Sequence, residues 1–209
     1  MKNRIGLSAK KIALVAVMTA TIEGAKMALA AIPNVEAVTL LCAVYGYVFG
    51  GLGILSTSLF VLIETFIYPI HSWVIYYAIH WNAICFTFWI LGKKKVKNRI
   101  ILTLFAFLHT AFFGVESSLV DTLLFAGISN FWKEFAALYV RGIWFYVTEV
   151  VCNLFLFPIA FLPLTKVLFR AKERFFEEKK KQAPMSESKE METDESVVMP
   201  WDKPKAPTE

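Results

Sequence analysis

The stretch Val38–Tyr68 reads VTLLCAVYGYVFGGLGILSTSLFVLIETFIY, and it decides the fold because it is almost continuously apolar. A membrane span needs about 20 residues, so the stretch is too long for one straight span. Its centre carries Gly50-Gly51-Leu52-Gly53, and each glycine weakens a helix interior by about 1 kcal/mol. We therefore expect two short helices, each of about 12–17 residues, forming a hairpin that turns at residues 50–53.

Four other apolar runs surround this stretch, and together they exclude a soluble globular enzyme. The chain is 57% hydrophobic, whereas soluble domains contain about 45–50% apolar residues. The first run is too long for the apolar region of a signal peptide and is therefore taken as a membrane helix. The runs are Leu7–Ala31, Trp73–Gly92, Ile100–Gly114 with a more polar extension to Gly127, and Ala137–Leu168. We predict an all-α integral membrane protein, a bundle of six transmembrane helices with a short second and third helix.

Three clusters of Lys and Arg set the expected orientation of these helices. They lie at residues 2–11, 93–99 and 166–174, each at the edge of an apolar run. Such clusters mark the cytoplasmic ends of membrane helices. We therefore expect the protein to lie in the plasma membrane with both termini in the cytoplasm. The net charge of +5 is then an orientation signal rather than a sign of nucleic-acid binding. The loops at 32–36, 68–72 and 127–134 are expected outside.

The chain divides by composition into three parts. Residues 1–170 form the expected membrane domain, and residues 171–182 a charged, amphipathic helical extension in the cytoplasm. Residues 183–209 are rich in Pro, Ser, Glu and Lys, which predicts a disordered acidic tail. The three cysteines (Cys42, Cys85 and Cys152) lie in apolar runs without CxxC spacing, so we expect core residues rather than disulfides or a metal site.

Charged residues inside the expected spans suggest a polar chamber that opens outward. Charges are costly in a membrane and usually face the interior of a bundle or water. Glu23 and Lys26 are spaced to pair with each other on one helix, which needs no ligand. The others must find partners elsewhere, or lie at the membrane interface. The full set is Glu23, Lys26, Glu64, Glu116, Asp121, Arg141 and Glu149.

Two helix faces carry the residue types of a binding pocket. On Trp73–Gly92 the face contains Trp73, Tyr76, Tyr77, His80 and Trp81. It fits either a pocket for a flat ring or an interfacial aromatic belt, although a belt does not usually extend two turns inward. On Ala137–Leu168, a stripe contains Arg141, Phe145, Thr148, Glu149 and Cys152, with Asn153 at its edge. Arg141 and Glu149 are too far apart to pair locally.

The first apolar run has a third face, made of small residues, and the chain lacks the motifs of an enzyme. Ala9, Ala13, Ala16, Ala20 and Gly24 share one side, which suits either internal packing or docking of another membrane protein. There is no GxxxxGK[ST], HExxH or GxSxG motif and no paired metal ligands. We therefore expect no catalysis, no metal and no cofactor.

Two segments resemble the substrate-binding S components of energy-coupling factor transporters. They are the run KIALVAVMTA at residues 11–20, with its Ala-xxx-Ala step, and the loop IPNVE at residues 32–36, followed by VTLL and a glycine-bounded hairpin. The resemblance covers about residues 8–170. It implies capture of a vitamin or related micronutrient on the outer face, and association with a transmembrane coupling subunit and two cytoplasmic ATPases, which use the ATP.

The resemblance also implies roles for particular residues. The alanines Ala16 and Ala20, or Ala9 and Ala13, would dock the coupling subunit, and the loop with Asn34 and Glu36 would gate the site. The last three helices would supply pocket residues. The candidate substrate-binding residues are Asn34, Glu36, Glu64, Tyr68, Trp73, Tyr77, Trp81, Arg141, Glu149 and Asn153.

Two other functions stay open at this point. A stand-alone proton-coupled carrier would use Glu64, Glu116, Glu149 and His80 as its relay, and a membrane scaffold would use the tail to bind a soluble partner. The sequence does not name the ligand: a flavin, a pterin, a corrinoid and a modified nucleobase all suit an aromatic pocket with charges.

Overall fold

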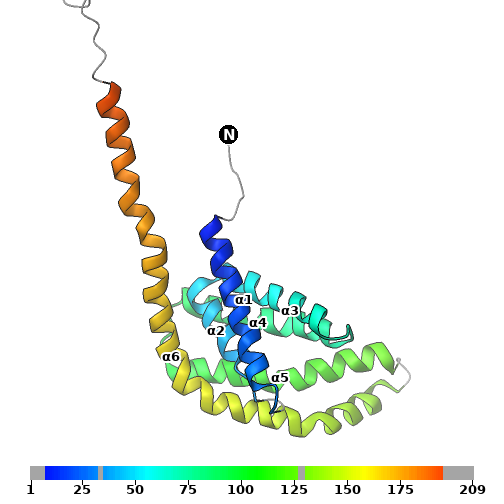
Figure 1. Cartoon of the computed structure of the whole chain (residues 1–209). Coiled ribbons are helices and arrows are strands. Elements are labelled where there is room, and N and C mark those ends of the chain that lie inside the picture. The colour runs from blue at the N-terminus through cyan, green and yellow to red at the C-terminus, as the bar shows by residue number, and fades with distance from the viewer. Residues whose placement is uncertain (1–7, 33–34, 127–129, 195–209) are drawn as a thin grey trace, which may run out of the picture. The chain divides into compact units, whose positions relative to one another are not determined.

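The computed structural model describes residues 8–32, 35–126 and 130–194, with side chains to Phe176, and within these ranges it is entirely helical (Figure 1). The helices are α1 (Ala9–Leu29), α2 (Val38–Phe49), α3 (Gly51–Ile67), α4 (Trp73–Lys93), α5 (Arg99–Phe125) and α6 (Phe131–Asp194). Helices α1, α4, α5 and the Phe131–Phe176 part of α6 are long and apolar enough to cross a membrane, whereas α2 and α3 are shorter. An all-helical protein suited to several membrane crossings was the coarse prediction from the sequence, and it is confirmed.

The hairpin expected around the glycines is present, and its break lies at Gly50. Helix α2 ends at Phe49, α3 begins at Gly51, and Gly50 between them has a φ of 60°. A side chain at this position would face both a strained backbone and Trp89, since a Cβ there would lie 2.6 Å from the Trp89 Nε1. The sequence needs glycine here for the sharp turn between two short helices.

Helix α2 is the centre of the described core. Almost all of its side chains are buried, and it contacts α1, α3, α4 and α5. Its backbone approaches α4 closely, because a Cβ added at Gly46 would lie only 2.1 Å from the carbonyl oxygen of Cys85. Aromatic side chains join α6 to the same core: Phe157 and Phe161 stack at 4.7 Å, and Tyr47 of α2 meets the Phe161 ring edge-on.

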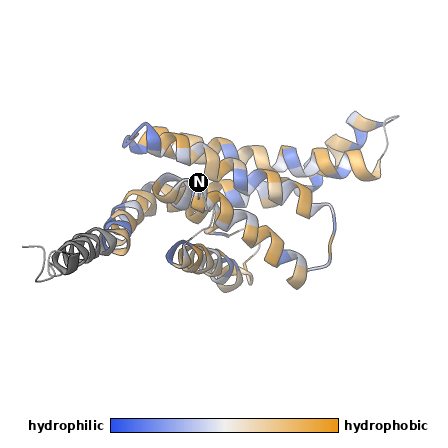
Figure 2. Ribbon diagram, turned by 90° about the horizontal axis from the view of Figure 1, so that it is seen from above, coloured by the Kyte–Doolittle hydropathy of each residue, from blue (hydrophilic) through white to orange (hydrophobic). Residues whose placement is uncertain are grey.

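The outward surface of the helices is strongly apolar. Phe66, Ile100 and Trp144 are each more than three-quarters exposed, and many other Leu, Ile and Phe side chains point outward with them. Figure 2 shows that apolar residues make up much of each helix. Soluble proteins rarely expose so much contiguous apolar surface, whereas lipid-facing helices do.

Helix α6 runs without a break through Pro158 and Pro163 to Asp194. The expected helical extension at 171–182 therefore lies inside α6. The backbone is also helical at 183–194, where the sequence suggested disorder, and residues 195–209 of that tail lie outside the described part. The segment 185–194 contains three Glu and two Met, which favour helix although the segment offers little for a core to bury. The chain divides into two compact units, Met1–Lys166 and Val167–Glu209.

Candidate functional site

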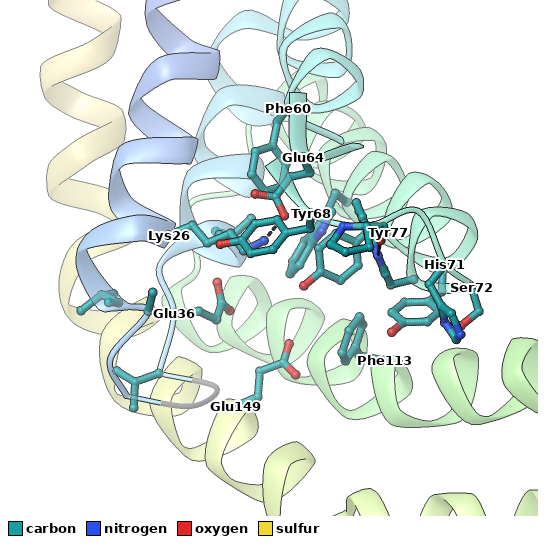
Figure 3. Close-up of a pocket in the computed structure, with 18 of the residues that line it drawn as sticks. Lys26, Glu36, Phe60, Glu64, Tyr68, His71, Ser72, Tyr77, Phe113 and Glu149 are labelled. Carbon is teal, nitrogen blue, oxygen red and sulfur yellow. Dashed lines mark hydrogen bonds and ion pairs between the residues drawn. The ribbon is translucent and has the colours of Figure 1, made fainter. Parts of the chain in front are cut away.

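A cavity of about 750 Å³ lies among the helices of the first unit (Figure 3). Its walls come from all six helices and from the loops that precede α2 and α4, with α2 contributing only its first residue, Val38. Small-molecule sites commonly enclose about 300–1,000 Å³ and combine apolar walls with a few polar groups. The cavity thus has the size of a site for one small organic molecule.

Aromatic side chains form most of one wall. The Tyr77 ring meets Trp73 at 5.3 Å and Trp81 at 5.5 Å, both edge-on, and Trp81 stacks on Phe113 at 6.0 Å. These contacts hold each ring at a fixed angle to the cavity. The aromatic lining residues are Phe60, Tyr68, Trp73, Tyr76, Tyr77, Trp81 and Phe113. The aromatic face that the sequence predicted on α4 is therefore part of the cavity wall rather than only an interfacial belt.

Lys26 enters the cavity from α1 and pairs with Glu64 of α3. Its Nζ also lies 4.7 Å from the centre of the Tyr68 ring and 5.3 Å from that of Tyr77, within cation–π range. The sequence predicts that Lys26 pairs with Glu23 on the same helix, but its salt bridge is with Glu64 instead. Both Glu23 carboxyl oxygens are buried without a hydrogen-bond partner, because the Lys26 side chain reaches the neighbouring helix instead.

Three further carboxyl groups line the cavity: those of Glu36, Asp121 and Glu149. Glu36 is held in place, since it accepts hydrogen bonds from the Thr39 backbone N–H at 2.8 Å and from Asn153 Nδ2 at 2.7 Å. Glu149 is only 3% exposed, and its Oε1 has no hydrogen-bond partner. Asp121 Oδ1 and Glu64 Oε1 are also buried without one. The cavity therefore combines fixed and unsatisfied acidic oxygens.

Seven of the ten predicted substrate-binding residues line this cavity. They are Glu36, Glu64, Tyr68, Trp73, Tyr77, Trp81 and Glu149. Asn153 is buried behind the lining, where it donates to Glu36 and to the Glu149 backbone carbonyl, so it positions an acid instead of facing the ligand space. Asn34 lies outside the described residues.

Arg141 does not line the cavity: its side chain is exposed, as are those of Phe145 and Thr148 on the same predicted stripe. The inward face of α6 is instead Glu149, Asn153 and Phe157, which are all buried. The predicted stripe includes Arg141 because a charge within a membrane span usually faces inward. In a membrane helix large apolar residues also face outward, so hydropathy does not mark the inner side.

Sequence reasoning did not select several lining residues. Lys26, Tyr76 and Asp121 were noticed as polar or aromatic residues in spans, so the signal for them existed. Phe60 and Phe113 gave no signal, because the chain contains 19 Phe and most need no functional explanation. His71 lies in the loop before α4, and only the folded arrangement brings it to the cavity.

The small-residue face of α1 points away from the rest of the described chain. Ala9, Ala13, Ala16 and Ala20 are all exposed, and no atom outside α1 lies within 4 Å of where a Gly24 Cβ would be. The opposite face packs inward through Val15, Met18, Thr19 and Ile22, and the Thr19 hydroxyl bonds to Ser56 of α3 at 3.2 Å. Internal packing within the described residues thus does not use the alanines.

A second buried polar group lies between α4 and α5. His80 Nδ1 is 2.7 Å from Glu116 Oε2, and His109 Nε2 is 3.0 Å from the Thr87 hydroxyl. The His80 ring contacts Trp81 and Phe113 edge-on, each at 4.8 Å, so the pair supports two rings of the cavity wall from behind. Neither His80 nor Glu116 lines the cavity.

Together the fold and site define an all-helical protein with membrane-suited helices and a small-molecule-sized, aromatic and acidic cavity. Over the residues that the structure describes, no three His, Cys, Asp or Glu side chains are grouped to hold a metal ion. Comparison of the chain with family models, with curated proteins and with solved structures finds no match.

Proposed function

We propose that this chain is the substrate-binding subunit, or S component, of an energy-coupling factor type importer, and that it captures a vitamin or related micronutrient. The observation that carries the proposal is that two faces of α1 have different surroundings. Lys26 of this helix reaches into the cavity, while the alanine face of the same helix is exposed and unused by the described chain. A binding subunit that must also dock on a separate coupling subunit needs both surfaces.

The proposed arrangement is a six-span bundle in the plasma membrane, with α2 and α3 as the short hairpin and both termini in the cytoplasm. The three basic clusters support this orientation. It puts the loops before α2 and α4, and with them the mouth of the cavity, on the outer face. The coupling subunit and two cytoplasmic ATPases would supply the energy, and the chain itself would catalyse no reaction.

In this function Glu36 has a positioning role at the entrance. It joins the loop before α2 to α6, through Asn153, and to the first turn of α2, through the Thr39 N–H. The loop residues Ile32 and Val35 line the same cavity. If this loop is the gate over the cavity, as we propose, its opening would break the Glu36–Asn153 hydrogen bond.

The test replaces Ala16 and Ala20 by Phe in the full chain, expressed with its coupling subunit and ATPases. Because two bulky side chains block close helix approach, we expect loss of copurification and of ATP-driven uptake, with binding of the retained small molecule unchanged. Ala137→Phe is the control, since Ala137 is also exposed but lies on α6. Loss of binding with intact assembly would show that the alanine face is not the docking surface.

A stand-alone proton-coupled carrier is the second candidate, favoured by the buried His80–Glu116 pair with His109 nearby. Proteoliposomes containing only this chain, with a pH gradient and no ATPase, decide between the two. If these proteoliposomes take up the substrate, and the His80→Gln variant does not, the chain is a proton-coupled carrier and the S-component proposal is wrong. No uptake under these conditions, with uptake restored by the coupling subunit and ATPases, would support the S component.

A further inference from the structure

We infer that the ligand of the cavity is an organic cation, a flat micronutrient that carries its positive charge on an amine or a ring nitrogen. The inference rests on the proposed function only in that the cavity captures a small molecule. It narrows the ligand from any flat polar compound to one charge class, and it comes from the charges, the unsatisfied atoms and the aromatic rings of the cavity.

The first argument is the imbalance of charge in the lining. Four carboxyl groups (Glu36, Glu64, Asp121 and Glu149) face one ammonium group, that of Lys26. Lys26 is already paired with Glu64. An anionic ligand would therefore meet three further acids and no free cation among the described lining residues, whereas a cation would reduce the repulsion among them.

The second argument is that two of these acids are completely or almost completely buried, and each has one carboxyl oxygen without a hydrogen-bond partner. Glu64 is 0% exposed and Glu149 is 3% exposed, and one oxygen of each has no hydrogen-bond donor. Buried polar oxygens are normally satisfied, and an ionised carboxylate in an apolar environment is costly unless it is paired. Figure 3 shows the Glu149 side chain pointing from α6 into the cavity, toward the side where Lys26 and Glu64 lie.

The third argument is that the cavity already holds one alkylammonium group of the protein's own. Lys26 Nζ lies within 6 Å of the ring centres of Phe60, Tyr68 and Tyr77, with the Glu64 carboxylate beside it. Aromatic rings together with a carboxylate are the usual surroundings of a bound organic cation. Three further rings, Trp73, Trp81 and Phe113, line the same cavity as Glu149 and add aromatic surface for a second cation.

The experiment compares three probes of nearly equal shape on the purified full chain: N-methylquinolinium, quinoline and quinoline-2-carboxylate, which are cationic, neutral and anionic at pH 7. Binding is followed by quenching of tryptophan fluorescence, since Trp73 and Trp81 line the cavity. We expect the cation to bind at least about tenfold more tightly than the neutral probe, and the anion not to bind. Equal affinity for the three probes, a preference for the anion, or no binding of the cation would overturn the inference.

Glu149→Gln removes one acid while keeping its shape, and is expected to weaken binding of the cation about tenfold or more without a similar effect on quinoline. Glu173→Gln is the matched control, because Glu173 lies exposed on the same helix. Thermal melting of both variants shows whether they fold. If Glu149→Gln folds and binds N-methylquinolinium as well as the unchanged chain does, the charge of Glu149 does not hold the ligand and the inference is wrong.

Mass spectrometry of any small molecule retained after mild purification gives an independent answer, since a retained anion would contradict the inference. The inference of a cationic ligand and the proposed function can fail independently of each other. ATP-driven uptake of an anionic or neutral compound would keep the S component and reject the cation. Cation binding without any coupling subunit or ATP dependence would reject the S component and keep the cation.

Discussion

Two acid–base pairs in the described part of the chain have similar chemistry but different surroundings. Lys26 and Glu64 join α1 to α3 at the wall of a cavity of about 750 Å³, with unsatisfied acids across from them. His80 and Glu116 join α4 to α5 behind the aromatic wall, and neither faces the cavity. The first pair leaves Glu64 Oε1 buried without a hydrogen-bond partner at the cavity wall. The second pair leaves His80 Nε2 without a partner, but among Trp81, Phe113 and His109 and away from the cavity.

This difference shows that a charge inside a membrane helix does not by itself mark a binding site. Seven charged residues looked alike in the sequence, and their roles separate only when the empty volume and the neighbouring rings are known. A pair next to open space can exchange partners with a ligand. An enclosed pair mainly positions the groups packed against it.

The largest expected effect on stability comes from removing Lys26 from the Lys26–Glu64 pair. Lys26→Met leaves the Glu64 carboxylate buried without its cation and should lower the free energy of unfolding in detergent by about 3 kcal/mol. Adding Glu64→Gln to Lys26→Met should recover most of this loss, because the unpaired charge is then gone. Reversible unfolding measured by circular dichroism checks both values, and a double variant no more stable than Lys26→Met would contradict the explanation.

A smaller effect is expected from the second pair. His80→Gln should lower the free energy of unfolding by about 1–2 kcal/mol, since it removes one hydrogen bond to a charged group. Ligand affinity should change by less than about threefold if, as the comparison implies, the pair only supports the wall. Fluorescence titration with the same cationic probe decides this, and a large loss of affinity would mean that the two pairs are not separate in function.

The smallest effect concerns the ring above Lys26. Tyr68→Leu removes the closest cation–π partner, at 4.7 Å, and should cost about 0.5–1 kcal/mol because the site is partly exposed. Tyr68→Phe keeps a ring and serves as the control, with a smaller expected change. Melting temperatures of the two variants give the comparison, and an equal loss in both would assign the effect to the hydroxyl group rather than to the ring.

Much of the fold was predictable because it follows from local chemistry. The apolar runs gave the helices, and the glycines gave the break at Gly50, where the positive φ excludes most side chains. The periodicity of α4 gave the aromatic wall, since residues on one helix face must meet the same neighbour. Each of these features is decided by residues that are close together in the chain.

The remaining features depend on contacts that local reasoning cannot see. Lys26 pairs with a residue 38 positions away, and nothing in the spacing of Glu23 and Lys26 reveals it. Arg141 looked like a pocket residue because it is charged, but the inner side of α6 is defined by what packs there. Asn153 lay at the edge of the predicted stripe, and its role in holding Glu36 requires a second segment more than one hundred positions away.

The exposed alanine face of α1 affects how easily another surface can cover this helix. An alanine side chain has no rotamers, so it loses no conformational entropy when another surface covers it. The exposed positions Ala9, Ala13, Ala16 and Ala20 therefore present a surface that is already ordered before anything touches it. Covering these four alanines with a protein helix would require no reorganisation of their side chains, which would suit the docking contact proposed above.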